Sequence, residues 1–133
     1  MKHIILAGDS IFDNGIYVKS GVPDVSNQLQ GLMGENDKVS LLAVDGHVIK
    51  NVEGQLKKIP NDTTHLVISI GGNDTLHILG ELSRATRNIG DGFLTFHDFR
   101  ESFESDYIEM LTNALSLNIP TTLCTIYHPC FNH

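Results

Sequence analysis

The chain has 133 residues, of which 41% are hydrophobic and 19% charged, and its formal net charge at pH 7 is −7. This composition is typical of one globular domain, and the acidic charge without any lysine- or arginine-rich run argues against a nucleic-acid partner. No apolar run approaches the ~20 residues of a membrane span, and the short apolar stretch after Lys2 resembles a first strand rather than a signal peptide, so we expect a cytoplasmic protein without a membrane span.

Four short segments predict buried strands. Each is rich in apolar and β-branched residues, is bounded by polar residues, glycine or proline, and lacks clean alternation. This is the pattern of strands covered on both faces, which is typical of a parallel sheet. The predicted strands cover residues 3–8, 38–44, 65–71 and 121–127.

Helical patterns lie between these strands. Residues 23–33 start with Pro23 in a predicted first turn, residues 51–59 start with Asn51 as a predicted cap, and residues 98–115 start with a capping-box arrangement. Each has one apolar face. The faces are Val25, Leu29, Leu32 and Met33 in the first helix, Val52, Leu56 and Ile59 in the second, and Phe103, Tyr107, Met110, Leu111 and Ala114 in the third.

Residues 84–98 fit no element. Gly90 and Gly92 flank Asp91 there, which predicts a mobile loop or hairpin that borders the functional site. The order of strands and helices along the chain predicts an α/β fold, a doubly wound parallel sheet with right-handed crossovers.

Polar and small residues follow each predicted strand. Gly8-Asp9-Ser10 follows the first strand, Gly46 the second, the stretch GGND at 71–74 the third, and His128 the fourth. In an open α/β sheet, functional groups gather beyond the carboxyl ends of the strands. We therefore expect these groups to share one edge of the sheet.

These groups suit acyl transfer. A serine hydroxyl attacks a carbonyl carbon when a base takes its proton. The resulting oxyanion needs preorganised donors, and the Ser10 N–H, the Gly46 N–H and the Asn73 side-chain amide would supply three. Taken alone, Gly8-Asp9-Ser10 is more typical of a strand-to-helix turn with a cap, GGND is also a common turn composition, and Gly46 carries little information.

The stretches AGDSIFDN, VDGHVIKN and GGND resemble, in order, the first three sequence blocks of the GDSL or SGNH hydrolases, a superfamily of esterases and lipases. The resemblance covers the whole chain. It implies a flavodoxin-like, three-layer αβα fold and a hydrolase that acts on small-molecule esters or acyl groups. It also implies that Ser10 is the nucleophile, that Ser10, Gly46 and Asn73 form the oxyanion hole, and that Asp9 orients the turn.

The family places an Asp-x-x-His block after a fifth strand, where it supplies the base and its orienting carboxylate. No such block follows the fourth predicted strand here. Among the seven histidines, His128 is the best placed to reach the site. The alternative function is an impaired SGNH-like binding or assembly module that keeps the pocket without the usual base.

We expect neither a cofactor nor a metal. The sequence contains neither the P-loop pattern nor the dinucleotide fingerprint after the first strand. His128, Cys130 and His133 bring imidazole and thiolate groups together, but their spacing matches no common zinc site.

The fourth predicted strand is apolar on both faces. Its apolar residues are Leu123, Cys124, Ile126 and Tyr127. In the family a fifth strand lies along this edge, and natural monomers avoid an exposed apolar edge. We therefore expect residues 1–133 to be a single, C-terminally incomplete SGNH-hydrolase-like domain, or a homo-oligomer that covers the edge of residues 121–127.

Overall fold

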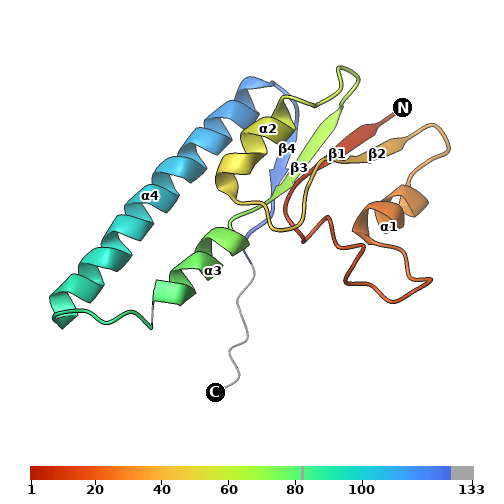
Figure 1. Cartoon of the computed structure of the whole chain (residues 1–133). Helices are drawn as coiled ribbons and strands as arrows, with labels where there is room; N and C mark the ends of the chain where they lie inside the picture. The colour runs from red at the N-terminus through yellow and green to blue at the C-terminus, as the bar shows by residue number, and fades with distance from the viewer. Residues whose placement is uncertain (82, 127–133) are drawn as a thin grey trace.

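The computed structural model describes residues 1–81 and 83–126 (Figure 1). Four parallel strands form one sheet in the order β2-β1-β3-β4. The strands are β1 (His3–Gly8), β2 (Lys38–Leu41), β3 (His65–Ser69) and β4 (Thr121–Leu123). The helices are α1 (Val25–Leu32), the 3₁₀ helix η1 (Ile49–Asn51), α2 (Val52–Leu56), α3 (Gly72–Glu81) and α4 (Ile89–Ser116).

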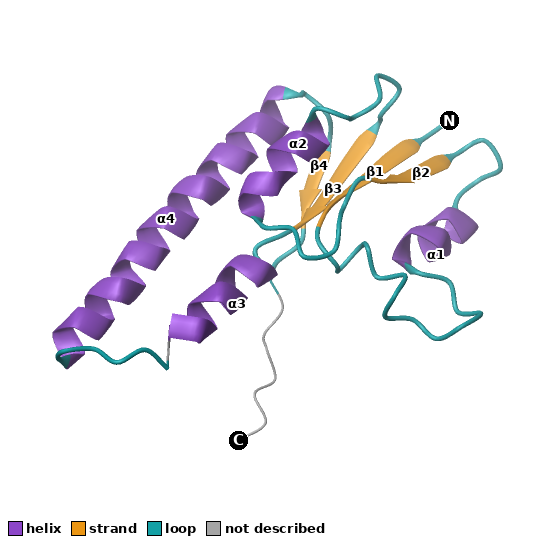
Figure 2. Cartoon of the chain, viewed as in Figure 1, coloured by secondary structure: helices purple, strands orange, loops and turns teal. Residues whose placement is uncertain are grey.

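The helices form two layers around the sheet. Figure 2 shows α2 and α4 on one side of the strands and α1 on the other. Each face of the sheet has its own apolar cluster, with α2 and α4 contributing to the first and α1 to the second. The fold is therefore the predicted three-layer α/β fold with a parallel sheet.

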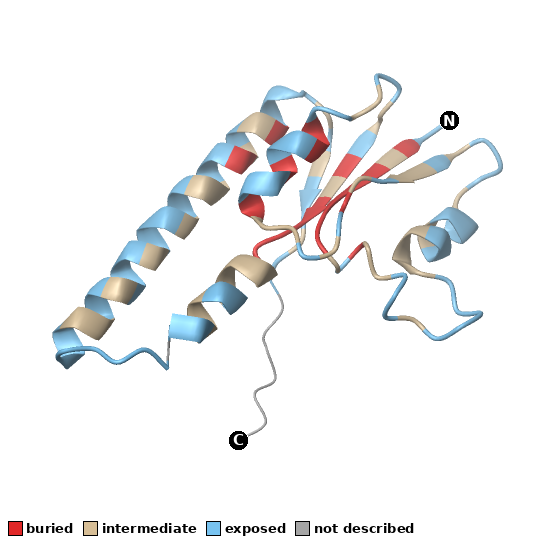
Figure 3. Ribbon diagram, in the orientation of Figure 1, coloured by how far each residue is buried: buried red, intermediate tan, exposed pale blue. Residues whose placement is uncertain are grey.

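The core lies at β1, β3 and the helical turns that face them (Figure 3). Ile5 and Leu66 are fully buried there. The apolar face predicted for residues 98–115 is confirmed, since Met110 and Ala114 are buried and its other three members pack against the same cluster. This packing fixes α2 and α4 against the sheet and thereby positions the loops at its carboxyl edge.

Helix α1 begins later than predicted. Asp24 is its N-cap, because the Asp24 side chain accepts a hydrogen bond from the Asn27 N–H at 2.8 Å. Leu29 packs against the sheet as expected, but Leu32 is 86% exposed, so its assignment to the buried face was wrong. Leu32 is the last residue of the helix, with Met33 as its C-cap.

Asn51 occupies the N-cap position of α2 as predicted, but its side chain makes no capping hydrogen bond to that helix. It is the last residue of η1, and its Oδ1 accepts a hydrogen bond from the Val48 N–H at 2.9 Å. The 3₁₀ turn therefore starts the helical segment three residues earlier than the sequence indicates. Val52 and Leu56 are buried as predicted.

The prediction of a loop over residues 84–98 was wrong for most of that stretch. Helix α4 begins at Ile89, with the Asn88 side chain as its cap, accepting from the Asp91 N–H at 3.0 Å. A glycine in a helix costs about 1 kcal/mol relative to alanine. Here the cap and the acidic residue in the first turn favour the helix start, and a helix of 28 residues propagates past both glycines.

Three strands are shorter than predicted. Beyond the end of β2, the Ala43 and Val44 N–H groups still donate to β1, at 3.0 Å and 3.1 Å, so the chain follows β1 without regular pairing. Tyr127, at the end of the predicted fourth strand, lies outside the described residues. Within the described part of the chain, no helix combines the length and apolar character needed to cross a membrane.

Candidate active site

The loop after β1 holds Ser10 in a tight turn. The Asp9 N–H donates to the Ser69 carbonyl at the end of β3, at 3.2 Å. The Asp9 carbonyl then accepts from the N–H groups of Phe12 and Asp13, both at 3.1 Å. Ser10 is partly exposed at the carboxyl edge of the sheet.

The Asp9 carboxylate is buried beneath this turn. It is 4% exposed and accepts a hydrogen bond from the Ile11 N–H at 3.0 Å, so it orients the turn from inside. Burial raises the pKa of Asp9, the Ile11 hydrogen bond opposes this rise, and the negative charges of Asp74 and Asp45 add to it. The Asp9 side chain therefore holds the turn through the Ile11 N–H, while burial makes its ionised form less favourable.

We expect Asp9→Asn to raise the melting temperature at pH 7.5 by roughly 2–4 °C. The folded-state pKa of Asp9 is raised, which means that the folded protein favours the protonated carboxyl. The contribution of Asp9 to the free energy of unfolding is therefore complete below its unfolded-state pKa and is lost as the pH rises through its folded-state pKa. An asparagine keeps the acceptor for Ile11 without the charge. The gain in melting temperature should shrink towards pH 4. Asp98→Asn, on the exposed face of α4, is the control. A melting temperature of Asp9→Asn below that of wild type at pH 7.5 would contradict the expectation.

The loop after β2 carries Gly46 at its tip. The His47 N–H donates to the Val44 carbonyl at 3.2 Å, and Gly46 has a φ of 78°, which favours glycine. The Asp45 N–H donates to the Asp13 carboxylate at 2.8 Å. This bond ties the Gly46 loop to the Ser10 loop.

Asn73 lies in the first turn of α3, directly after β3. Its Nδ2 donates to the His47 carbonyl at 2.9 Å, and a side-chain amide has a second hydrogen to offer. The neighbouring Asp74 carboxylate accepts from the Ile49 N–H at 3.1 Å. Burial raises the pKa of Asp74. The loops that carry the three predicted residues, Ser10, Gly46 and Asn73, are thus joined by hydrogen bonds at one edge of the sheet.

Gln55 of α2 connects two of these loops from below. Its side chain is buried, with Oε1 accepting from the Gly8 N–H at 2.7 Å and Nε2 donating to the Gly8 carbonyl at 2.8 Å. These two bonds identify Nε2 as the amide nitrogen, which also lies 2.9 Å from His47 Nδ1. Nδ1 must then accept, so neutral His47 carries its proton on Nε2.

A mainly apolar cavity of about 130 Å³ lies beside the loop that carries Ser10, although Ser10, Gly46 and Asn73 are not among the residues that line it. Both chain neighbours of Ser10, Asp9 and Ile11, line it. The rest of its wall comes from the ends of β3 and β4 and the residues that follow them: Ser69, Ile70, Gly72, Cys124, Thr125 and Ile126. None of residues 84–98 lines this cavity, so the predicted loop there does not border it.

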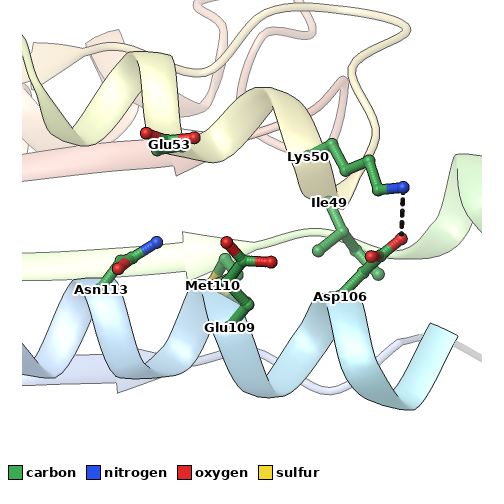
Figure 4. A pocket seen from close by; sticks show the side chains of 7 residues that line it. All are labelled: Ile49, Lys50, Glu53, Asp106, Glu109, Met110 and Asn113. Atoms are coloured by element: carbon green, nitrogen blue, oxygen red, sulfur yellow. Dashed lines mark ion pairs between the residues drawn. The ribbon is translucent and has the colours of Figure 1, made fainter. Parts of the chain in front are cut away.

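A second hollow, of about 220 Å³, lies between η1, α2 and α4 (Figure 4). Its polar lining includes the carboxylates of Glu53, Asp106 and Glu109, and Lys50 pairs with Asp106 at 3.3 Å. None of the three predicted site residues contributes to it. It is a charged surface groove on the helical face, separate from the loops at the sheet edge.

A Ser–His–Asp series occurs at the opposite end of the sheet. His3 is 1% exposed, with Nδ1 2.9 Å from Asp62 Oδ1 and Nε2 2.9 Å from Ser40 Oγ. The ring joins β1, β2 and the loop before β3, and both of its nitrogens are engaged. Its burial and the hydrogen bonds of both ring nitrogens are those of a structural core histidine.

Sequence analysis overlooked two Asp-x-x-His patterns that come before the fourth strand. The first, Asp62–His65, lies at the opposite end of the sheet, where Asp62 contacts His3, and the second, Asp74–His77, lies at this site. The second pair lies on α3 beside Asn73, where His77 is exposed and its charge lowers the pKa of Asp74 against the larger effect of burial. Spacing alone identifies this pair. The predicted pocket residue His128 lies outside the described residues.

Solved structures share this architecture at low sequence identity. TesA superposes with a TM-score of 0.63 at 18% identity, covering 96% of this chain and 62% of its own. AlinE4, an SGNH-hydrolase family esterase, superposes with a TM-score of 0.60 at 21% identity, covering 96% of this chain and 60% of its own. The esterase EstA from Pseudoalteromonas, in a structure inhibited by monoethylphosphonate, superposes with a TM-score of 0.60 at 15% identity, covering 97% of this chain and 62% of its own.

These matches concern the fold. No protein-family model matches the chain, and no curated protein matches it significantly. The chain spans about three fifths of the length of the solved structures named above. The predicted resemblance is confirmed at the level of architecture: the chain has the α/β fold of SGNH-hydrolase esterases and GDSL-like lipases.

Proposed function

We propose that this chain is the Ser10-containing part of a serine esterase. In the first step, the Ser10 oxygen bonds to the carbonyl carbon of an ester, and the alcohol leaves with a proton. Water then releases the acid and restores Ser10. The observation that carries this proposal is the hydrogen-bonded junction of the Ser10, Gly46 and Asn73 loops beside an apolar cavity.

The charges around the site favour a neutral substrate, and the size of the cavity favours a short acyl chain. Four carboxylates, from Asp9, Asp13, Asp45 and Asp74, lie in the hydrogen-bonded network of these loops. Their field disfavours an anionic group near Ser10. The cavity of about 130 Å³ suits a small acyl group.

The oxyanion would be held by three donors. The N–H groups of Ser10 and Gly46 and the free hydrogen of the Asn73 amide are the groups we assign to this role. Gly46 is exposed, and a β-carbon added there would meet no atom within 4 Å, so the backbone is open to a ligand.

His47 is a poor base for Ser10. Its Nδ1 accepts from Gln55, and in the neutral ring Nε2 carries the proton. A base needs a free lone pair to take the Ser10 proton. His77, one turn after Asn73 on α3, and His128 are the rings to test in this role.

The test is covalent labelling with a neutral fluorophosphonate, in which the Ser10 oxygen bonds to phosphorus and fluoride leaves. We expect the wild-type chain to label and Ser10→Ala to remain unlabelled. Ser40→Ala is the matched control, because Ser40 also contacts an imidazole but lies at the other end of the sheet. Equal labelling of wild type and Ser10→Ala would refute the assignment of the nucleophile.

The same assay assigns the base. We expect the variant that removes the base, His77→Ala or His128→Ala, to label more slowly while retaining its fold. A wild-type chain that binds a short ester without labelling would instead support the alternative, an SGNH-like binding module.

A further inference from the structure

Gln55 occupies an unusual position for a glutamine. Its side chain is 3% exposed, and every hydrogen-bonding atom of its amide is engaged. It binds both the N–H and the carbonyl of Gly8, two residues before Ser10. When every hydrogen-bonding atom of a buried amide has a partner, the amide holds those partners in one geometry. Losing any of the bonds would leave a buried polar group unpaired.

The bonds of Gln55 continue to the other side of the site. Nε2 reaches His47 Nδ1 at 2.9 Å, and the His47 carbonyl accepts from Asn73 Nδ2 at 2.9 Å. One continuous series therefore runs from Gly8 through Gln55 and His47 to Asn73. It links the end of β1, the loop after β2 and the first turn of α3.

We propose that Gln55 is a positioning residue that fixes the distance between the Ser10 turn and the oxyanion donors Gly46 and Asn73. The proposal rests on the esterase function proposed above. Misplacing reacting groups by about 1 Å costs on the order of 100-fold in rate, so loss of this connection would slow acylation without removing any group that touches the substrate.

The connection makes a second, spectroscopic prediction that needs no substrate. Because Gln55 Nε2 donates to Nδ1, neutral His47 should have a bare Nδ1 and a protonated Nε2. In Gln55→Glu the amide donor becomes a carboxylate, which still accepts from Gly8 but now also needs a proton from His47. The His47 proton should therefore move to Nδ1.

The experiment compares wild type, Gln55→Leu, Gln55→Glu and Gln28→Leu. Gln28 is the matched control, an exposed glutamine on α1 whose Nε2 donates to the Pro23 carbonyl at 2.7 Å. The readouts are the fluorophosphonate labelling rate per folded molecule and the nitrogen chemical shifts of the His47 ring. We expect labelling of Gln55→Leu to fall by about 10- to 100-fold, Gln28→Leu to label at the wild-type rate, and Gln55→Glu to switch the tautomer.

Several outcomes would overturn the proposal. Folded Gln55→Leu and Gln55→Glu that label at the wild-type rate would show that Gln55 does not position Ser10. A protonated Nδ1 in wild-type His47 would contradict the series itself. If Gln55→Leu does not fold, Gln55→Glu carries the test, since it keeps the acceptor for the Gly8 N–H. If wild type does not label above Ser10→Ala, the proposed function fails, and the tautomer readout alone decides whether Gln55 joins the loops.

Discussion

Gly8→Ala is expected to prevent folding or to lower the free energy of unfolding by more than about 4 kcal/mol, which is a large part of the 5–15 kcal/mol typical of a domain. Gly8 has a φ of 130°, a conformation that other residues rarely adopt. A β-carbon built there would lie 1.8 Å from the Ser69 carbonyl oxygen, inside the contact between β1 and β3. Backbone on both sides of the clash cannot move without breaking the central strand pair.

Urea unfolding followed by circular dichroism measures this effect, and two other glycines provide controls. At Gly54, inside α2, an added β-carbon meets nothing within 4 Å, so Gly54→Ala should stabilise the protein by about 0.5–1 kcal/mol. Gly46 is equally open but has a φ of 78°, so Gly46→Ala should cost about 1 kcal/mol. A Gly8→Ala protein that unfolds at the same urea concentration as Gly46→Ala would contradict the steric argument.

The sheet could be predicted because its strands are short apolar runs that neighbouring layers cover on both faces. The ends of the elements could not, because they depend on single hydrogen bonds. The Asn88 cap, the acidic Asp91 in the first turn and the length of α4 together sustain the helix past the two glycines that made residues 84–98 resemble a loop. Similarly, Asp24 rather than Pro23 sets the start of α1.

The candidate site was predictable only in part, for a related reason. Ser10, Gly46 and Asn73 follow strand ends, and the topology of a parallel sheet brings strand ends together. Gln55 gives no such signal. In the sequence it occupies a polar position of an amphipathic helix, and only the path of the chain past Gly8 makes that position buried.

Asn73→Ala should lower kcat on a short neutral ester by about 10²–10³-fold, the effect of removing one oxyanion donor from a complete catalytic set. The Asn73 amide has one hydrogen on the His47 carbonyl, and the proposal assigns the other to the oxyanion. The oxyanion forms only in the transition state, so KM should change little. Alanine also removes the bond between α3 and the Gly46 loop, so a free energy of unfolding lowered by about 1 kcal/mol should accompany the loss of turnover.

These two effects of Asn73 can be separated by measuring turnover per folded molecule. Asn51→Ala is the matched control, because the Asn51 side chain also holds this loop, through the Val48 N–H, but contributes no donor to the site. It should lose stability while kcat per folded molecule stays at the wild-type value. If Asn73→Ala behaves in the same way, losing stability alone, then Asn73 is a structural tie between α3 and the Gly46 loop. The oxyanion must then be held by the backbone N–H groups of Ser10 and Gly46 without it.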